Sequence, residues 1–130
     1  MTGIDTNVLV RLFALDNPEQ HRKAHALFQS FSTQSPGYIS QVSLVEFIWV
    51  LGNRYRQPKT EIIEWLTWLV ESIEITLENQ AVVEQALFTY ATTNSDFADC
   101  PIERAGHSAG CAETVTFDKT AAKAAGMRLL

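Results

Sequence analysis

Short strand-like segments alternate with amphipathic helical patterns along this chain, and that alternation constrains its fold more than any other feature. Strands are expected at residues 1–5, 38–40, 73–77, 113–117 and 127–130. Between them, apolar side chains recur at spacings of three and four, the pattern of a helix with one buried face. Helices are expected at residues 6–13, from Pro18 onward, at 43–55, 59–72 and 79–90, from 95–99 to Gly106 or Gly110, and at 119–125.

Strands that alternate with helices favour right-handed crossovers and a parallel sheet covered on both faces. We therefore predict an α/β fold, a three-layer α/β/α sandwich around a short, mainly parallel five-stranded sheet. At 130 residues, the chain has the length of one domain, since domains cluster at roughly 100–150 residues. The prediction is a single domain over residues 1–130.

The composition and the N-terminal residues indicate the cellular compartment in which such a chain would act. No apolar run approaches the roughly 18 residues of a membrane-spanning helix, and the N-terminus lacks the basic start and cleavage site of a signal peptide. The two cysteines are too few for a disulfide scaffold or a zinc site built from cysteines. We expect a reduced, cytoplasmic protein that does not enter membranes.

The charge balance is acidic, with 10 Lys and Arg against 15 Asp and Glu and a net charge of −5. This balance disfavours a broad nucleic-acid-binding surface, because phosphate contacts require clustered Lys and Arg. It leaves a metal-dependent nuclease open, since such an enzyme concentrates carboxylates at its centre. The placement of the acids therefore matters more than their sum.

Five acids fall where a parallel sheet would gather them. Asp5 and Asp118 each follow a predicted strand, and ligands of open parallel sheets bind at the carboxyl ends of strands. If the first strand neighbours the fourth, both acids lie at one edge. Glu46 lies in the helix after the second strand, and Asp96 and Asp99 lie at the start of the helix before the fourth strand.

Carboxylates that converge on one site repel each other and raise each other's pKa values, a cost that a divalent cation removes. Magnesium and manganese prefer oxygen ligands. Such a cation polarises a phosphoryl oxygen and lowers the pKa of an attacking water. The pattern therefore indicates phosphodiester hydrolysis.

Each acid also has a purely structural interpretation. Asp5 could cap a helix, although Thr6 is the residue we expect at that N-cap, and Asp118 could be a turn residue. Asp96 and Asp99 resemble ordinary first-turn acids that interact with a helix dipole. Glu46 fits a structural role least well, because it lies within an apolar run and would be buried unless it faced a cleft.

Four segments resemble the motifs of PIN-domain ribonucleases, in family order and at similar spacing. They are IDTNVL at residues 4–9, SQVSLVEF at 40–47, DFADC at 96–100 and TVTFD at 114–118. Within that family, the size and pattern look most like the VapC toxins of bacterial toxin–antitoxin modules. The resemblance spans nearly the whole chain.

The resemblance implies a magnesium- or manganese-dependent endoribonuclease, neutralised by a cognate antitoxin protein and usually homodimeric. By motif, the acidic quartet corresponds to Asp5, Glu46, Asp99 and Asp118. Metal would bind between Asp5, Asp99 and Asp118, with Glu46 a ligand through water or an orienter of the nucleophile. Asp96 is an accessory acid, and Thr6 and Thr116 occupy hydroxyl positions beside the site, where each also reads as a helix cap or strand residue.

Pro101 departs from the family pattern, which continues its third motif with small and aliphatic residues. If the helix begins at Asp96, Pro101 clashes with the preceding turn at a cost of about 3 kcal/mol. If the helix begins near Asp99, Pro101 is tolerated and the Asp99 side chain is re-aimed. The departure keeps a catalytically weakened PIN-fold binding module open, and the acids alone also allow a phosphatase or a DNA nuclease.

The aromatic residues of two central helices exceed what one face of a small sheet requires. We expect Phe47, Trp49, Trp65 and Trp68 to line a groove for an antitoxin segment or a second protomer, and ordinary core packing is the alternative. His21 and His25 are spaced as metal ligands, but they lie on a polar helix face beside two cations, which favours a solvated surface.

Overall fold

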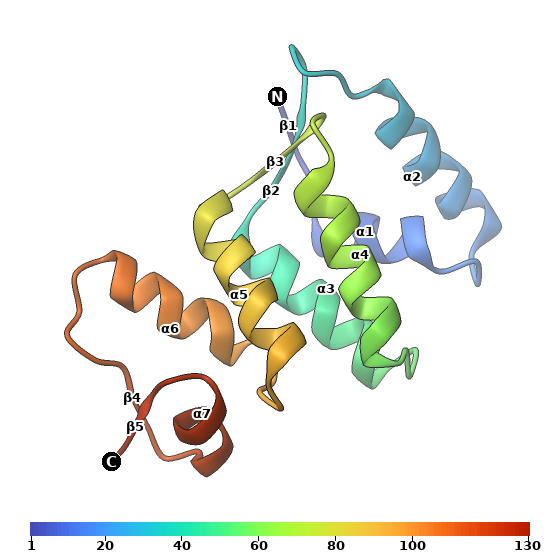
Figure 1. The fold of residues 1–130 in the computed structure, drawn as a ribbon. Coiled ribbons are helices and arrows are strands. Elements are labelled where there is room, and N and C mark those ends of the chain that lie inside the picture. Colours follow the sequence, from blue (N-terminus) through green and yellow to red (C-terminus); the bar gives the residue numbers. More distant parts are fainter. The chain divides into compact units, whose positions relative to one another are not determined.

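The computed structural model describes all 130 residues, which form seven helices and five strands in two compact units (Figure 1). The first unit, residues 1–78, contains β1 (Thr2–Gly3), α1 (Thr6–Phe13), α2 (Pro18–Ser30), β2 (Gly37–Ile39), α3 (Gln41–Asn53), α4 (Lys59–Glu71) and β3 (Ile75–Leu77). The second unit, residues 79–130, contains α5 (Gln80–Thr92), α6 (Asp99–Ser108), β4 (Val115–Thr116), α7 (Lys119–Ala124) and β5 (Arg128–Leu129).

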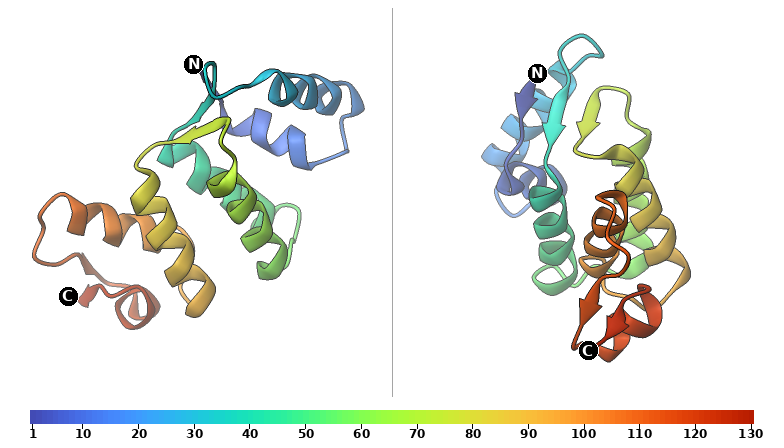
Figure 2. Two further views of the ribbon diagram at one scale, coloured as in Figure 1. Left: turned by 45° about the horizontal axis from the view of Figure 1, so that its top comes forward. Right: turned by 90° about the vertical axis from the view of Figure 1, so that its left-hand side faces the viewer.

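The strands form two parallel sheets. In the first unit the order is β1-β2-β3, with Gly3 opposite Tyr38 and Ile39 opposite Leu77 (Figure 2, right). In the second unit β4 pairs with β5. The α/β alternation and the parallel pairing are confirmed, whereas the single five-stranded sheet and the three-layer sandwich are not.

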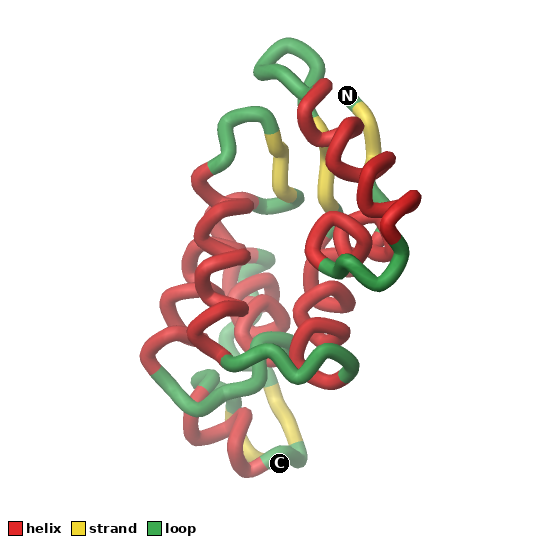
Figure 3. Tube along the Cα trace, turned by 90° about the vertical axis from the view of Figure 1, so that its right-hand side faces the viewer, coloured by secondary structure: helices red, strands yellow, loops and turns green.

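Strand length explains that difference. β1, β4 and β5 are each two residues long, and Figure 3 shows how short the strands are beside the helices. The pairing of a strand is specified by its pattern of buried and exposed residues, and two residues carry almost no pattern. The condition that the first strand neighbours the fourth is not met by the strand pairs that form, because β1 pairs with β2 and β4 pairs with β5.

Capping side chains set the helix starts. Asp5, not Thr6, is the N-cap of α1: its backbone is extended and its Oδ1 accepts a hydrogen bond from the Thr6 N–H at 2.9 Å. The prediction of a Thr6 cap is wrong because both residue types suit an N-cap and they are adjacent. Ser40 caps α3 by accepting from the Ser43 N–H at 3.2 Å, so this helix begins at Gln41 rather than at Ser43.

Helix α6 begins at Asp99, which confirms the second of the two interpretations of Pro101. A tight turn precedes the helix, in which the N–H groups of Asp99 and Cys100 donate to the carbonyls of Asp96 and Phe97 at 3.2 and 3.0 Å. Pro101 is therefore the third helical residue, where a backbone N–H has no partner inside the helix to lose. Asp99 occupies the first helical position, and Asp96 lies in the turn.

Close packing holds the first unit together. Ile39 and Leu51 are fully buried, and α3 contacts both α1 and α4. At Gly37 a Cβ atom would lie 2.6 Å from Phe31 Cε2 and 2.7 Å from Ile4 Cδ1, so a larger residue at this position of β2 would have to displace these side chains. In the second unit α5 packs on α6. None of the helices combines the length and apolar character needed to cross a membrane.

Candidate active site

Asp5 lies between β1 and α1, at the carboxyl end of its strand. It is exposed, and its carboxylate holds the first N–H of α1 through Oδ1. The adjacent Thr6 is buried at 7% exposure. The N-terminus of a helix carries a partial positive charge, so an acidic side chain suits this position.

Glu46 lies in the middle of α3 and is exposed. The neighbouring Leu44, Phe47 and Ile48 turn toward the core, with exposures of 2%, 1% and 5%. Glu46 lies on the opposite face of the helix from these residues, so its carboxylate is not buried although its sequence neighbours are apolar. Its carboxylate is accessible to a ligand.

Asp118 repeats the arrangement of Asp5 in the second unit. It follows β4 and caps α7, where its Oδ1 accepts from the N–H groups of Thr120 at 2.7 Å and Ala121 at 3.0 Å. Thr116 contributes through its hydroxyl, which accepts from the Asp118 N–H at 3.0 Å. Thr116 thus fixes the backbone of Asp118, and its hydroxyl hydrogen is available to a further acceptor.

Asp99 is the acid with the most unusual environment. It is partly buried, and burial raises its pKa above the ordinary value. The negative charges of Asp96 and Asp118 raise the pKa of Asp99 further. Within the second unit, Asp99 is therefore repelled by the nearby Asp96 and by Asp118, which is distant in sequence, and a bound cation would relieve this repulsion.

A buried polar network supports the turn that carries Asp96 and Asp99, and sequence reasoning missed it. The Ser95 hydroxyl, 3% exposed, lies 2.8 Å from Thr93 Oγ1 and 3.1 Å from Cys100 Sγ. The Cys100 thiol in turn reaches the Asp96 carbonyl at 3.6 Å. The hydroxyls on either side of Asn94 were the available signal, since buried Ser and Thr side chains bond to nearby backbone in turns.

The same turn packs against Tyr90 on α5. The rings of Tyr90 and Phe97 meet edge to face, with centroids 5.5 Å apart. Burial raises the pKa of Tyr90 above its ordinary value, and the nearby Asp96 and Cys100 raise it further. An aromatic contact and a hydroxyl–thiol network thus fix the position of the two acids.

The predicted ligands belong to different units. Asp5 and Glu46 lie in the first, and Asp96, Asp99 and Asp118 lie in the second. No group of three or more His, Cys, Asp or Glu side chains is gathered closely enough to hold a metal ion. The predicted ligands nevertheless suit magnesium or manganese chemically, since each of them is a carboxylate. The pKa of Asp99 is already raised by the negative charges of Asp96 and Asp118, which a cation would offset.

Comparison with known families decides the relationship of the chain. The PIN domain family model matches residues 4–127. The chain belongs to the PIN-domain family. PIN domains are generally metal-dependent nucleases, and the match spans all four acidic motifs. No curated protein matches the chain.

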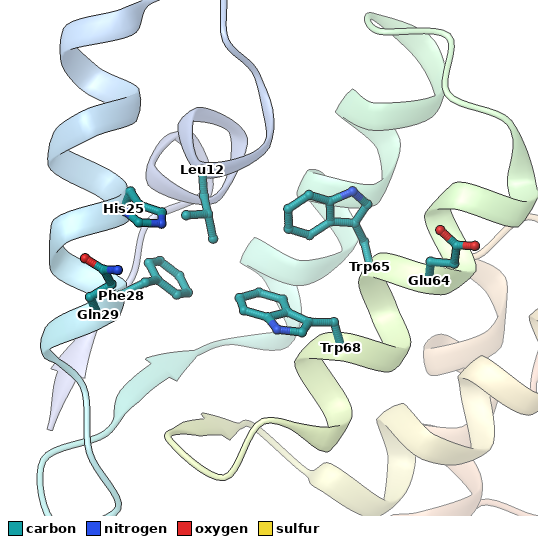
Figure 4. A pocket seen from close by; sticks show the side chains of 7 residues that line it. All are labelled: Leu12, His25, Phe28, Gln29, Glu64, Trp65 and Trp68. Atoms are coloured by element: carbon teal, nitrogen blue, oxygen red, sulfur yellow. The ribbon is translucent and has the colours of Figure 1, made fainter.

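A hollow in this PIN-family chain lies between α2 and α4, and Leu12 of α1 also lines it (Figure 4). Its volume is about 500 Å³, and Trp65 and Trp68 on α4 face Phe28 on α2 across it. The ring centroids of Phe28 and Trp68 are 6.2 Å apart, and those of Trp65 and Trp68 are 5.6 Å apart. Trp68 is 43% exposed.

This hollow corrects the predicted aromatic groove. Trp65 and Trp68 line it as expected. Phe47 does not, because it is 1% exposed and packs edge to face against Trp65 within the core. Trp49 is 59% exposed but does not line the hollow, which lies between α2 and α4, whereas Trp49 belongs to α3. Leu12 and Phe28, which the sequence did not suggest, complete the apolar wall.

The raised pKa of Asp99 predicts a pH-dependent stability. The folded state favours the protonated carboxyl, so the stabilisation present below the unfolded value of 3.8 is lost as pH rises through the folded pKa. Asp99→Asn removes the ionised form, so it should melt at a higher temperature than the wild type at neutral pH and at the same temperature below pH 3.8.

Thermal unfolding followed by circular dichroism, without divalent cations, measures this difference. Glu84→Gln, which neutralises an exposed acid on α5, is the matched control and should follow the wild-type profile. If wild type and Asp99→Asn keep a constant separation at every pH, the carboxyl of Asp99 is not destabilised by its surroundings.

Proposed function

We propose that this PIN-family chain is a magnesium- or manganese-dependent endoribonuclease of the VapC type, the toxin of a bacterial toxin–antitoxin pair. The observation that carries the proposal is Asp99, a partly buried carboxyl beside two further acids in a chain whose PIN match spans all four acidic motifs. A partly buried acid with a raised pKa and like-charged neighbours marks a candidate functional site. The motif pattern favours RNA as the substrate.

In this proposal, Asp5, Asp99 and Asp118 hold the cation, and Glu46 binds through water or orients the attacking water. Magnesium or manganese, when bound, polarises a phosphoryl oxygen and lowers the pKa of that water. The water oxygen forms a bond to phosphorus as one phosphorus–oxygen bond of the strand breaks, which leaves one phosphate end and one hydroxyl end. Thr116 acts as a positioning residue, because its hydroxyl holds the backbone of Asp118.

Hydrolysis of DNA or of a phosphate monoester would use the same carboxylates, because carboxylates and magnesium do not distinguish these substrates. Matched RNA and DNA oligonucleotides test this directly. The start of α6 weakens the case for an impaired enzyme, since Pro101 occupies a helical position that tolerates it.

We expect Asp5→Asn to lower RNA cleavage by at least about 100-fold, because a metal ligand contributes several kcal/mol of transition-state stabilisation. Asparagine is as good an N-cap as aspartate, so the substitution should leave α1 intact. Cleavage of a labelled RNA in magnesium or manganese measures the rate, and circular dichroism checks the fold. Equal cleavage by both proteins would discard the mechanism.

For the partner, we propose that the α2–α4 hollow receives an apolar helical segment of the antitoxin. Exposed aromatic rings in a concave surface suit an amphipathic helix laid into a groove. Homodimer formation through the same surface is the competing use of these side chains. Both uses rest on the family resemblance.

Trp68→Ala should weaken antitoxin binding by roughly 30-fold, since buried aromatic anchors contribute about 2 kcal/mol or more. Trp49→Ala is the control, because the Trp49 side chain is also exposed but lies outside the hollow. Calorimetric titration with the cognate antitoxin measures both. Equal affinities for the two variants would count against this hollow, and a Trp68→Ala protein that turns from dimer to monomer in light scattering would assign it to a second protomer.

A further inference from the structure

A separate groove lies between α1 and α2, with a volume of about 480 Å³. Its floor is apolar and its rim is polar. Ala24 is buried, and Val8 and Leu27 are partly buried. The rim consists of two amides and two cations, namely Asn7, Gln20, Arg11 and Lys23.

Helical spacing explains why these side chains share one groove. Asn7 and Arg11 are four residues apart on α1, and Gln20 and Lys23 are three apart on α2, so each pair lies on one helix face. The two helices pack against each other in the first unit (Figure 2). The rim residues therefore flank one channel from both sides.

The side chains that line this groove carry charge opposite to that of the chain, although each cation also pairs with an acid outside the lining, Arg11 with Asp16 and Lys23 with Glu19. Two cations and no acid line it, although the net charge of the protein is −5. The α2–α4 hollow includes Glu64, and a third hollow in the second unit includes Glu84 and Glu103. The α1–α2 groove is thus suited to an anion, as the other two are not.

Arg11 is fixed in an orientation that leaves part of its guanidinium available. Its Nε donates to Gln20 Oε1 at 2.8 Å, and its Nη1 donates to Asp16 Oδ1 at 2.7 Å. Neither bond uses Nη2. A guanidinium held in place in this way loses little conformational entropy when it binds a phosphate.

Lys23 is held by fewer interactions. Its only ion pair, with Glu19 at 3.4 Å, joins side chains that are 75% and 68% exposed. Such an exposed ion pair contributes little to stability, so the Lys23 ammonium can leave Glu19 to bind a phosphate. The Gln20 amide keeps its two N–H donors after its oxygen accepts from Arg11.

The groove shares helix α1 with one residue of the candidate active site. Asn7 is two residues after Asp5, in the first turn of the same helix. We propose that the α1–α2 groove binds the RNA strand next to the cleaved phosphodiester, with Arg11 and Lys23 on a backbone phosphate and the apolar floor against the nucleoside. This inference rests on the proposed ribonuclease function.

Binding measured without cleavage tests the groove. We would titrate a fluorescently labelled single-stranded RNA oligonucleotide with the full chain in EDTA and follow fluorescence anisotropy over a range of salt concentrations. Lys23→Gln should weaken binding about tenfold, the loss of one charge-assisted hydrogen bond. The slope of log affinity against log salt should fall by about 0.7, one phosphate contact on a single strand.

Arg22→Gln is the matched control, because it removes the same charge from an exposed neighbour on α2 that does not line the groove. It should change the affinity less than about twofold, which is within the range of a screened surface charge. Circular dichroism checks that both variants fold.

Equal weakening by the two substitutions, no weakening by either, or no RNA binding by the wild type would overturn the proposed groove. The cleavage comparison of wild type with Asp5→Asn is independent of these measurements. If the wild type cleaves RNA but Lys23→Gln does not weaken RNA binding, the proposed function stands and the proposed groove is wrong. If Lys23→Gln weakens RNA binding but the wild type does not cleave RNA, the groove binds RNA and the proposed nuclease function is wrong.

Discussion

Two carboxylates each end a parallel strand and begin a helix, and the rest of the structure around the candidate site depends on that double position. Asp5 holds the first N–H of α1, and Asp118 holds two N–H groups of α7. Because the cap bond fixes where each helix begins, it also fixes the carboxylate at the end of its strand. The same oxygen chemistry that caps a helix suits a hard cation.

The electrostatic repulsion among the acids of the second unit acts on Asp99. Burial and two neighbouring acids raise the pKa of its carboxyl, and a hydroxyl–thiol network together with the Tyr90–Phe97 contact holds the preceding turn in place. A fold that gained nothing from these acids would be more stable without the repulsion. A partly buried acid with like-charged neighbours supports the proposal that this cluster binds a cation.

The sequence predicts the local structure well because local rules act within a few residues. Helical periodicity gives the helices, and Pro101 restricts where α6 can begin. Helical periodicity also places Phe47 and Trp49 on opposite faces of α3, so the two side chains could not line one groove. The prediction grouped them because both are aromatic. The sheet order could not be predicted, because two-residue strands such as β1 and β4 leave their partners unspecified. The Ser95–Cys100 network has no periodic pattern to reveal it.

The proposed mechanism requires that Asp5 and Asp118 ligate the same metal ion, and manganese titration calorimetry tests this requirement. Wild type, Asp5→Asn and Asp118→Asn would be compared, since asparagine preserves both helix caps. The account predicts one binding event that either substitution weakens by about tenfold or more, as loss of a charged oxygen ligand requires. If Asp118→Asn weakens manganese binding while Asp5→Asn leaves it unchanged, the two acids do not share an ion and the account is contradicted.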